Sequence, residues 1–219
     1  MSFFIRQHLN LSSGALSYLL VDPVTRGAAL IDAFDDCVDD YCAQVKNLGL
    51  DIRLLLYTGG WNESRDSCQL LKARTGARLM LHESITVMPA DHYLHHGETL
   101  YLGELMLNAY HTPGYAADAM VFRVDNLLFT GRTLLAGGLP QAESYSDIEK
   151  WYASVHDCLY HQPDDYLIYP GQLYHCRRVS CVAQEKHCNE LLPEACDAPV
   201  FFKRMQGDQQ AVSQATTNS

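Results

Sequence analysis

The amino-acid sequence predicts an α/β protein in which two β-sheets pack face to face, with helices on the outside. Strand-like segments come first, strands and helices then alternate, and a second group of strands and helices follows. Short unbroken apolar runs, such as residues 52–57, indicate strands that are buried on both faces. The length of 219 residues is sufficient for one large domain, which we place at residues 1–205.

The spacing of apolar residues predicts the individual elements. A helix is expected from Asp35 or Asp36 to Leu48, because its apolar residues recur every three or four positions and Gly49 then ends it. The other expected helices run from 62 or 64 to 74, from 147 to 158 and from 180 to 192. The expected strands span residues 3–6, 15–21, 27–31, 52–57, 78–81, 99–102, 105–110, 119–124, 127–130 and 166–169, the last of the series. Three segments are expected to lack regular structure: 83–97, 131–144 and the polar, disordered tail 206–219.

Composition narrows the classes of function. The formal net charge of −10 disfavours a nucleic-acid partner, since binding phosphates requires clustered Lys and Arg. No apolar run is long enough to cross a bilayer, and the N-terminus lacks the basic and apolar regions of a signal peptide. We therefore expect a cytoplasmic protein without a nucleic-acid or membrane partner. The eight cysteines include no Cys-x-x-Cys pair and are expected to be reduced and mostly buried.

The most informative stretch is the corner that follows the apolar run, Thr58-Gly59-Gly60-Trp61-Asn62-Glu63-Ser64. A buried strand stops at two glycines, and a polar cluster then begins a helix. α/β proteins usually place their chemistry at such junctions. This corner contains no histidine, no cysteine and no nucleophile beside a base. The junction therefore predicts a site without indicating a catalytic mechanism.

Several landmarks, taken in order, resemble the metallo-β-lactamase fold superfamily, in particular its glyoxalase II and persulfide dioxygenase branch. They extend from residue 3 to about residue 192 and include Tyr18-Leu19-Leu20, Ala29-Leu30-Ile31-Asp32, His111-Thr112-Pro113-Gly114, Phe129-Thr130-Gly131 and the block from Tyr169-Pro170-Gly171 to Asn189. The resemblance implies a four-layer αββα sandwich with a metal site at one edge of the sheets. It also allows a homodimer.

The resemblance puts the family's seven metal-ligand positions on residues of other kinds. The His-x-His-x-Asp-His corner falls on residues 59–64, the histidine after Thr-Pro-Gly on Tyr115, the bridging aspartate on Arg132 and the last histidine on Gln172. These positions hold Gly59, Trp61, Glu63, Ser64, Tyr115, Arg132 and Gln172. Among them, Glu63 alone keeps a side chain that commonly binds metals.

Arg132 makes metal binding at these positions unfavourable. Two unit charges about 4 Å apart interact by roughly 4 kcal/mol at an effective dielectric constant near 20, and a divalent ion would meet about twice that as repulsion. We therefore expect no metal and no other cofactor, and we hypothesise that Arg132 pairs with Glu63 instead. The alternative is that the substitutions arose independently and that Arg132 points to solvent.

These observations favour a pseudoenzyme, a protein of the metallo-β-lactamase fold that lacks the metal centre and acts by binding. Arg132 beside Trp61 and Tyr115 suits a small anionic ligand, and a protein partner at the same face is equally compatible. Binding of glutathione is not favoured, because the glutathione loop that the resemblance implies falls on residues 138–141, which contain no basic residue.

Two alternatives involve chemistry. A glyoxalase II-like thioester hydrolase or a persulfide dioxygenase would need metal at Glu63 together with recruited histidines, either His111 or the group His92, His95 and His96. That group otherwise belongs to an exposed loop. Metal-free sulfur chemistry would use Cys176 or Cys181, which flank a basic pair at 177–178 and otherwise serve packing.

Overall fold

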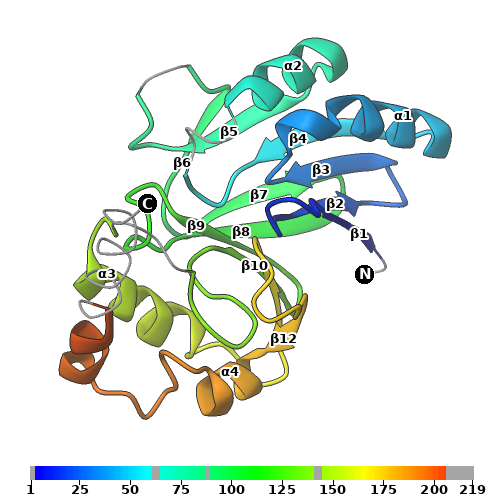
Figure 1. Ribbon diagram of the computed structural model, residues 1–219. Helices are drawn as coiled ribbons and strands as arrows, with labels where there is room; N and C mark the ends of the chain where they lie inside the picture. Colours follow the sequence, from blue (N-terminus) through cyan, green and yellow to red (C-terminus); the bar gives the residue numbers. More distant parts are fainter. Residues whose placement is uncertain (1–2, 61–64, 87–88, 141–144, 206–219) are drawn as a thin grey trace.

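The computed structural model describes residues 3–60, 65–86, 89–140 and 145–205. In this part of the chain the strands form two six-stranded sheets (Figure 1). The first sheet contains, in spatial order, β1 (Phe4–Leu9), β2 (Leu16–Val21), β3 (Gly27–Ile31), β4 (Asp51–Leu56), β5 (Arg78–His82) and β6 (His92–Leu94). The second contains β12 (Ser180–Cys181), β11 (Leu167–Pro170), β10 (Leu127–Gly131), β9 (Met120–Val124), β8 (Leu105–His111) and β7 (Glu98–Leu102).

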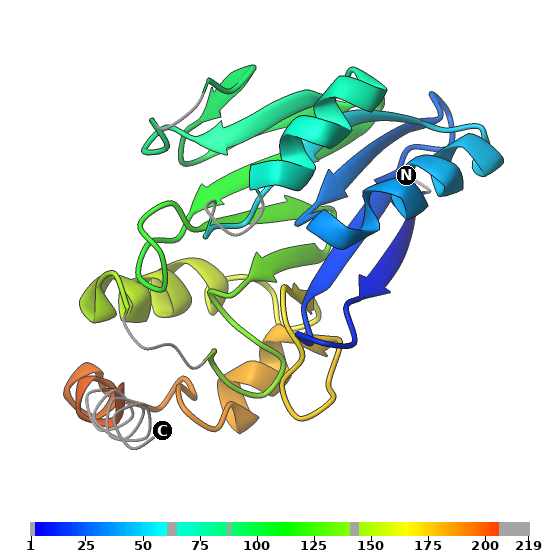
Figure 2. The same ribbon diagram turned by 45° about the horizontal axis from the view of Figure 1, so that its top comes forward.

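Helices cover the outer face of each sheet (Figure 2). The first sheet carries the short 3-10 helix η1 (Asp35–Cys37), α1 (Val38–Leu48) and α2 (Arg65–Thr75), whose apolar side chains share one buried cluster with the strands. The second sheet carries α3 (Ile148–Ala153), the π-helix η3 (Ser154–Leu159), α4 (Val182–Cys188) and the helical residues 198–205. Among the described helices, none has the length and apolar character needed to cross a membrane.

A separate apolar cluster fills the space between the two sheets. Strand β2 illustrates its origin: Tyr18 and Leu20 face this inter-sheet core, whereas Leu19 and Val21 face the helices. A strand that is covered on both sides needs apolar residues at every position, which explains the unbroken apolar runs of the sequence. The described residues thus form the expected four-layer αββα sandwich.

Most expected elements are present within a few residues of their expected ends. Strand β3 spans 27–31 as expected, and α1 ends at Gly49, which has the left-handed conformation that glycine tolerates (φ 61°). Asp147 caps α3 by accepting a hydrogen bond from the backbone N–H of Lys150 at 3.0 Å. The expected tail 206–219 and the expected start of α2 at 62 or 64 lie outside the described residues.

Four expectations about secondary structure are wrong. The segment 83–97 contains β6, which has no apolar pattern of its own and is held by parallel pairing with β5. The strand at 166–169 is followed by β12, and residues 198–205 form a helix that the sequence did not indicate. The helix expected at 180–192 ends at Cys188, because Asn189 leaves the helical conformation and its side-chain oxygen accepts the backbone N–H groups of Leu191 and Leu192.

Four strand ends meet at one edge of the sandwich. In the first sheet, β3 and β4 are parallel, and the N–H of Asp32 after β3 donates to the carbonyl of Leu56 at 3.0 Å. In the second, the N–H of Gly171 after β11 donates to the carbonyl of Gly131 at 2.7 Å. The N–H of Leu16 donates to the carbonyl of Gly171 at 2.8 Å and so joins the two sheets. Side chains that follow these strands are therefore gathered at one place.

Candidate functional site

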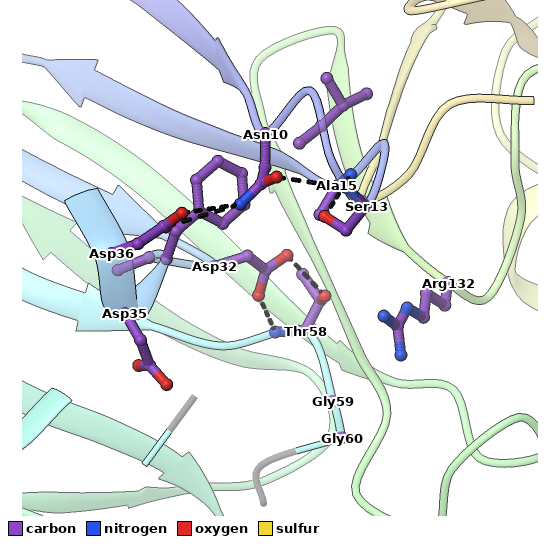
Figure 3. A pocket seen from close by; sticks show the side chains of 14 residues that line it. Asn10, Ser13, Ala15, Asp32, Asp35, Asp36, Thr58, Gly59, Gly60 and Arg132 are labelled. Atoms are coloured by element: carbon purple, nitrogen blue, oxygen red, sulfur yellow. Dashed lines mark hydrogen bonds between the residues drawn. The ribbon is translucent and has the colours of Figure 1, made fainter. Parts of the chain in front are cut away.

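A cavity of about 310 Å³ opens at this edge (Figure 3). It lies between the turn that precedes β2, the segment after β3, the corner after β4 and the segment after β10. Its lining residues are Asn10, Ser13, Ala15, Leu16, Asp32, Ala33, Phe34, Asp35, Asp36, Thr58, Gly59, Gly60, Arg132 and Gly171. The cavity is therefore built where the sequence places the strand-to-helix corner.

Asp32 and Thr58 form the rigid floor of the cavity. One carboxylate oxygen of Asp32 accepts the backbone N–H of Thr58 at 2.8 Å, and the other accepts the threonine hydroxyl at 2.7 Å. Asp32 adopts a positive φ of 56°, which aspartate tolerates better than most residues. Gly131, with a φ of 54°, lies so close to Thr58 that a Cβ there would stand 2.1 Å from the threonine hydroxyl oxygen. Only glycine fits this position without displacing the corner.

The two glycines of the corner are required by its shape. Gly59 and Gly60 have φ values of 136° and 70°. A Cβ at Gly59 would stand 3.0 Å from the Cα of Ala119, so the corner packs directly on the backbone before β9. The N–H of Gly60 donates to the carboxylate of Asp118 at 3.3 Å. These contacts fix the path of the backbone after β4, where it forms part of the cavity wall.

Arg132, the residue directly after β10, extends into the cavity (Figure 3). Its guanidinium donates to the hydroxyl oxygen of Tyr115 at 3.1 Å and lies 5.7 Å from the centre of that ring. Tyr115 packs edge-on against Trp151, at 5.7 Å between ring centres. Burial raises the pKa of Asp32 to about 6, and the positive charge of Arg132 acts in the opposite direction. Arg132 therefore favours the ionised form of Asp32.

The opposite wall of the cavity is acidic. Asp35 and Asp36, from η1, line it, and the side-chain amide of Asn10 donates to the carboxylate of Asp36 at 3.2 Å. The side-chain oxygen Oδ1 of Asn10 accepts the backbone N–H groups of Ser12 and Ser13 at 3.0 and 3.2 Å, which fixes the orientation of the amide. With Asp32, the lining contains three carboxylates and one guanidinium. Among the described residues, the lining is therefore negative overall, with one positive group.

The structure brings together some of the predicted site residues. Gly59 and Arg132 line the cavity and Tyr115 contacts Arg132. Gln172 follows Gly171 and pairs with Ala15 in an isolated antiparallel bridge. Arg132 lies against Tyr115 rather than pointing only to solvent. Trp61, Glu63 and Ser64 lie outside the described residues, and the pairing of Arg132 with Glu63 therefore stays a prediction.

Sequence reasoning missed the acidic wall. The sequence pattern indicates Asp35 and Asp36 only as the start of a helix, and Asp32 only as part of a landmark. A usable signal was present, because Asp32 follows a buried strand just as Thr58 does, and parallel strand ends meet at one edge. Asn10 had no such signal, since it lies in a polar turn between β1 and β2.

Each candidate histidine side chain has a different hydrogen-bond or ion-pair partner. His92 contacts the carboxylate of Glu98, and His95 lies 3.1 Å from a carboxylate oxygen of Glu83. His111 bonds to the carbonyl oxygen of Ala117 at 2.9 Å and its ring stacks on His82, whereas His96 reaches the backbone carbonyl of His111. Within the described ranges, no three His, Cys, Asp or Glu side chains form a group that could hold a metal ion.

The candidate thiols have different surroundings. All eight cysteines lie in the described part of the chain and carry free thiols. Cys176 is exposed and has a positive φ of 62°, next to His175 at 46°, whereas Cys181 is half-buried in β12. The loop at 138–141, where the resemblance implies glutathione binding, is described as far as residue 140. The carbonyl of its Gly138 accepts the side-chain amide of Asn189 at 3.2 Å.

Comparison with known proteins identifies the fold. No family model matches the chain. The crystal structure of ETHE1 from Myxococcus xanthus superposes with a TM-score of 0.85 at 27% identity, covering 93% of this chain and 90% of that one. A metallo-β-lactamase from Staphylococcus aureus gives a TM-score of 0.82 at 19% identity, covering 93% of this chain and 66% of that one. The chain has the metallo-β-lactamase fold.

The chain is also similar in sequence to two kinds of curated enzyme. The mitochondrial persulfide dioxygenase ETHE1 of Homo sapiens is 27% identical over 196 residues, 88% of this chain and 77% of that protein. A hydroxyacylglutathione hydrolase from Polaromonas is 29% identical over 164 residues, 72% of this chain and 62% of that protein. The fold and these relatives agree with the sequence landmarks, which resemble the glyoxalase II and persulfide dioxygenase branch of the superfamily.

Proposed function

We propose that this chain is a pseudoenzyme of the metallo-β-lactamase fold, which lacks a metal centre and acts by binding a small ligand in the cavity at the corner. The observation that carries the proposal is the position of Arg132. Its guanidinium lies in the cavity, is bonded to Tyr115 and is close enough to affect the charge of Asp32. A permanent positive charge at the centre of the site opposes a divalent cation and supports recognition of an anionic group.

The donor groups around the cavity do not fit a catalytic zinc or iron centre. Such centres usually take three protein ligands, most often histidines with a carboxylate. None of the described residues that line this cavity is a histidine or a cysteine. Both oxygens of Asp32 already accept hydrogen bonds from Thr58. These features support a site that has changed from metal binding to direct binding through side chains.

A second candidate function is enzymatic, as a persulfide dioxygenase or thioester hydrolase, and the relatives named above favour it. It would require metal ligands from residues 61–64 together with His111. The bond of His111 to Ala117 and its stacking on His82, at 3.9 Å between ring centres, argue against recruitment of this histidine. A protein partner at the cavity face is a third candidate.

Thermal unfolding with and without small carboxylates tests the proposal. We expect acetate, propionate or hexanoate to raise the unfolding temperature of the wild-type chain, and Arg132→Gln to abolish that shift. Arg178→Gln, which removes an exposed arginine outside the cavity, is the matched control and should keep it. Equal shifts in the two variants would remove Arg132 from the site. Consumption of persulfide or thioester after loading with iron or zinc would favour the second candidate.

A further inference from the structure

The second sheet has an outer face that its helices cover only in part. In the described part of the chain, these helices pack on β9, β10 and β11, where Val121, Leu128 and Ile168 belong to their buried cluster. At β7 and the start of β8 the outward side chains stay accessible, since Tyr101 is 65% exposed and Met106 is 49% exposed. These two residues are directly opposite each other in the antiparallel register and so form one patch.

A small cavity of about 250 Å³ adjoins Met106. Its apolar lining consists of Phe3, Leu105, Met106 and Val124, and Asp125 adds one exposed carboxylate. The volume lies below the usual range for small-molecule sites and suits a single side chain. An apolar enclosure with one hydrogen-bond acceptor matches a tyrosine, which has an apolar ring and a hydroxyl group that donates.

Tyr101 and this cavity lie on opposite sides of Met106. Tyr101 pairs with Met106 from β7, whereas Val124, the neighbour of Asp125, pairs with Leu107 from β9. Two strand spacings, about 10 Å in total, therefore separate Tyr101 from Asp125. The width of β8 thus keeps the tyrosine away from the cavity of its own chain. A projecting tyrosine and a cavity that suits a tyrosine lie side by side.

This arrangement is self-complementary. The two copies of a two-fold dimer contribute the same patch, so that patch must carry both partners of each contact. An axis beside Met106 would place the Tyr101 of each copy over the cavity of the other and bring the two methionines together. Each tyrosine would bury its ring among apolar side chains and donate its hydroxyl to Asp125 of the second copy.

We infer that the chain forms a homodimer through β7 and β8, in which Tyr101 of each copy occupies the cavity beside Met106 of the other. Asp125 precedes β10 and Arg132 follows it, so this surface lies at the opposite end of that strand from the candidate site. The dimer does not depend on the proposed function.

Charge opposes this dimer and determines its dependence on salt. Each chain carries a formal net charge of −10, so two copies repel each other. Salt screens this repulsion, whereas the burial of Tyr101 and Met106 involves no ion pair that salt would weaken. The dimer should therefore become tighter as the ionic strength rises. A dimer held by ion pairs would become weaker.

Sedimentation velocity of the purified protein over a series of concentrations provides the measurement. The wild type should dimerise with a dissociation constant of about 1 to 100 μM, as expected for a small interface. Tyr101→Ser should weaken the dimer by about a hundredfold or more, because a two-fold interface contains the substitution twice. Leu70→Ser is the control, since it removes an exposed apolar side chain from α2 on the other sheet and should leave the dimer unchanged.

A double-mutant cycle tests whether the tyrosine enters the cavity. Tyr101→Phe and Asp125→Asn should each weaken the dimer by roughly 3- to 30-fold, and the double variant should be no weaker than the weaker single variant. Asparagine tolerates the positive φ of 54° at Asp125, so the turn is retained. Because β8 separates the two residues within one chain, such coupling arises between copies. Urea unfolding of each variant confirms that it is folded.

Three outcomes would overturn the dimer as described. The first is a wild type that stays monomeric at all concentrations, or a dimer that weakens from about 0.05 M to about 0.3 M NaCl. The second is a dimer that Tyr101→Ser leaves intact, which would place the interface elsewhere. The third is additive loss in Tyr101→Phe and Asp125→Asn, which would exclude the tyrosine from the cavity. None of these outcomes affects the test of ligand binding at Arg132.

Discussion

The carboxylate of Asp32 accepts two hydrogen bonds from Thr58, one from the backbone N–H at 2.8 Å and one from the hydroxyl at 2.7 Å. The carbonyl oxygen of Thr58 accepts the N–H of Met120, from β9 of the other sheet, at 2.8 Å. The corner is thus tied to the end of β3 and to both sheets by hydrogen bonds. These bonds hold the cavity wall in place.

The ionisation of Asp32 should make the stability of the chain depend on pH. Burial raises its pKa from an ordinary value of 3.8 to about 6, so the folded state holds this proton more tightly than the unfolded state. The resulting stabilisation is present below about pH 4 and is lost as the pH rises through about 6. Between pH 4 and pH 7, the free energy of unfolding measured in urea should fall by roughly 1 to 3 kcal/mol more for the wild type than for Asp32→Asn. Parallel curves for the two proteins would contradict this account.

Gly131→Ala should be strongly destabilising, because a Cβ there would stand 2.1 Å from the hydroxyl oxygen of Thr58 and the φ of 54° is strained for alanine. Crowding and backbone strain together should lower the free energy of unfolding by about 2 to 4 kcal/mol. Gly76→Ala is the control, with a similar φ of 68° and nothing within 4 Å of the added carbon. It should cost only about 1 kcal/mol. Equal losses in denaturant unfolding would show that contact with Thr58 is unimportant.

Glu185→Gln should loosen the segment around Gly137. Glu185 is fully buried, and its carboxylate accepts the N–H of Gly137, the hydroxyl of Ser180 and the amide of Asn189. A glutamine would turn an NH₂ group toward these donors, at a cost of about 2 to 4 kcal/mol and a fall in melting temperature of roughly 4 to 16 °C. The control is Glu190→Gln, which changes a half-exposed partner of His175 and should lower the melting temperature by much less. A small effect at Glu185 would contradict the role of this network.

Alkylation of the native protein should discriminate among the cysteines. Cys176 and Cys188 are exposed and should react first with iodoacetamide. Cys68 should resist, because its side chain is fully buried and burial raises the pKa of its thiol to about 12. Mass spectrometry of the peptides at short reaction times provides the measurement. The same experiment with a polysulfide tests the alternative of sulfur chemistry, which requires selective modification of Cys176 or Cys181.

The fold could be predicted from sequence where local and tertiary requirements coincide. Strands such as β3 and β4 are apolar throughout because both of their faces are covered, and Gly49 ends α1 because the left-handed conformation there suits glycine. Strand β6 could not be predicted, since its residues are ordered by pairing with β5 rather than by their own pattern.

The cavity could be located from sequence but not described. The corner at Thr58 and Gly59 and the position of Arg132 follow from strand ends and from the resemblance. The acidic wall requires knowledge of how η1, which follows β3, approaches the turn at Asn10, which precedes β2. Such a long-range approach leaves no periodic signal in the chain.

The metal content of the purified protein tests the central claim most directly. The protein should be expressed with iron and zinc supplied, purified without chelators and measured by elemental analysis beside its protein concentration. Arg132 and the donor groups of the cavity predict less than about a tenth of an equivalent of either metal per chain. One or two equivalents of iron or zinc that survive dialysis would contradict the account and restore an enzymatic function.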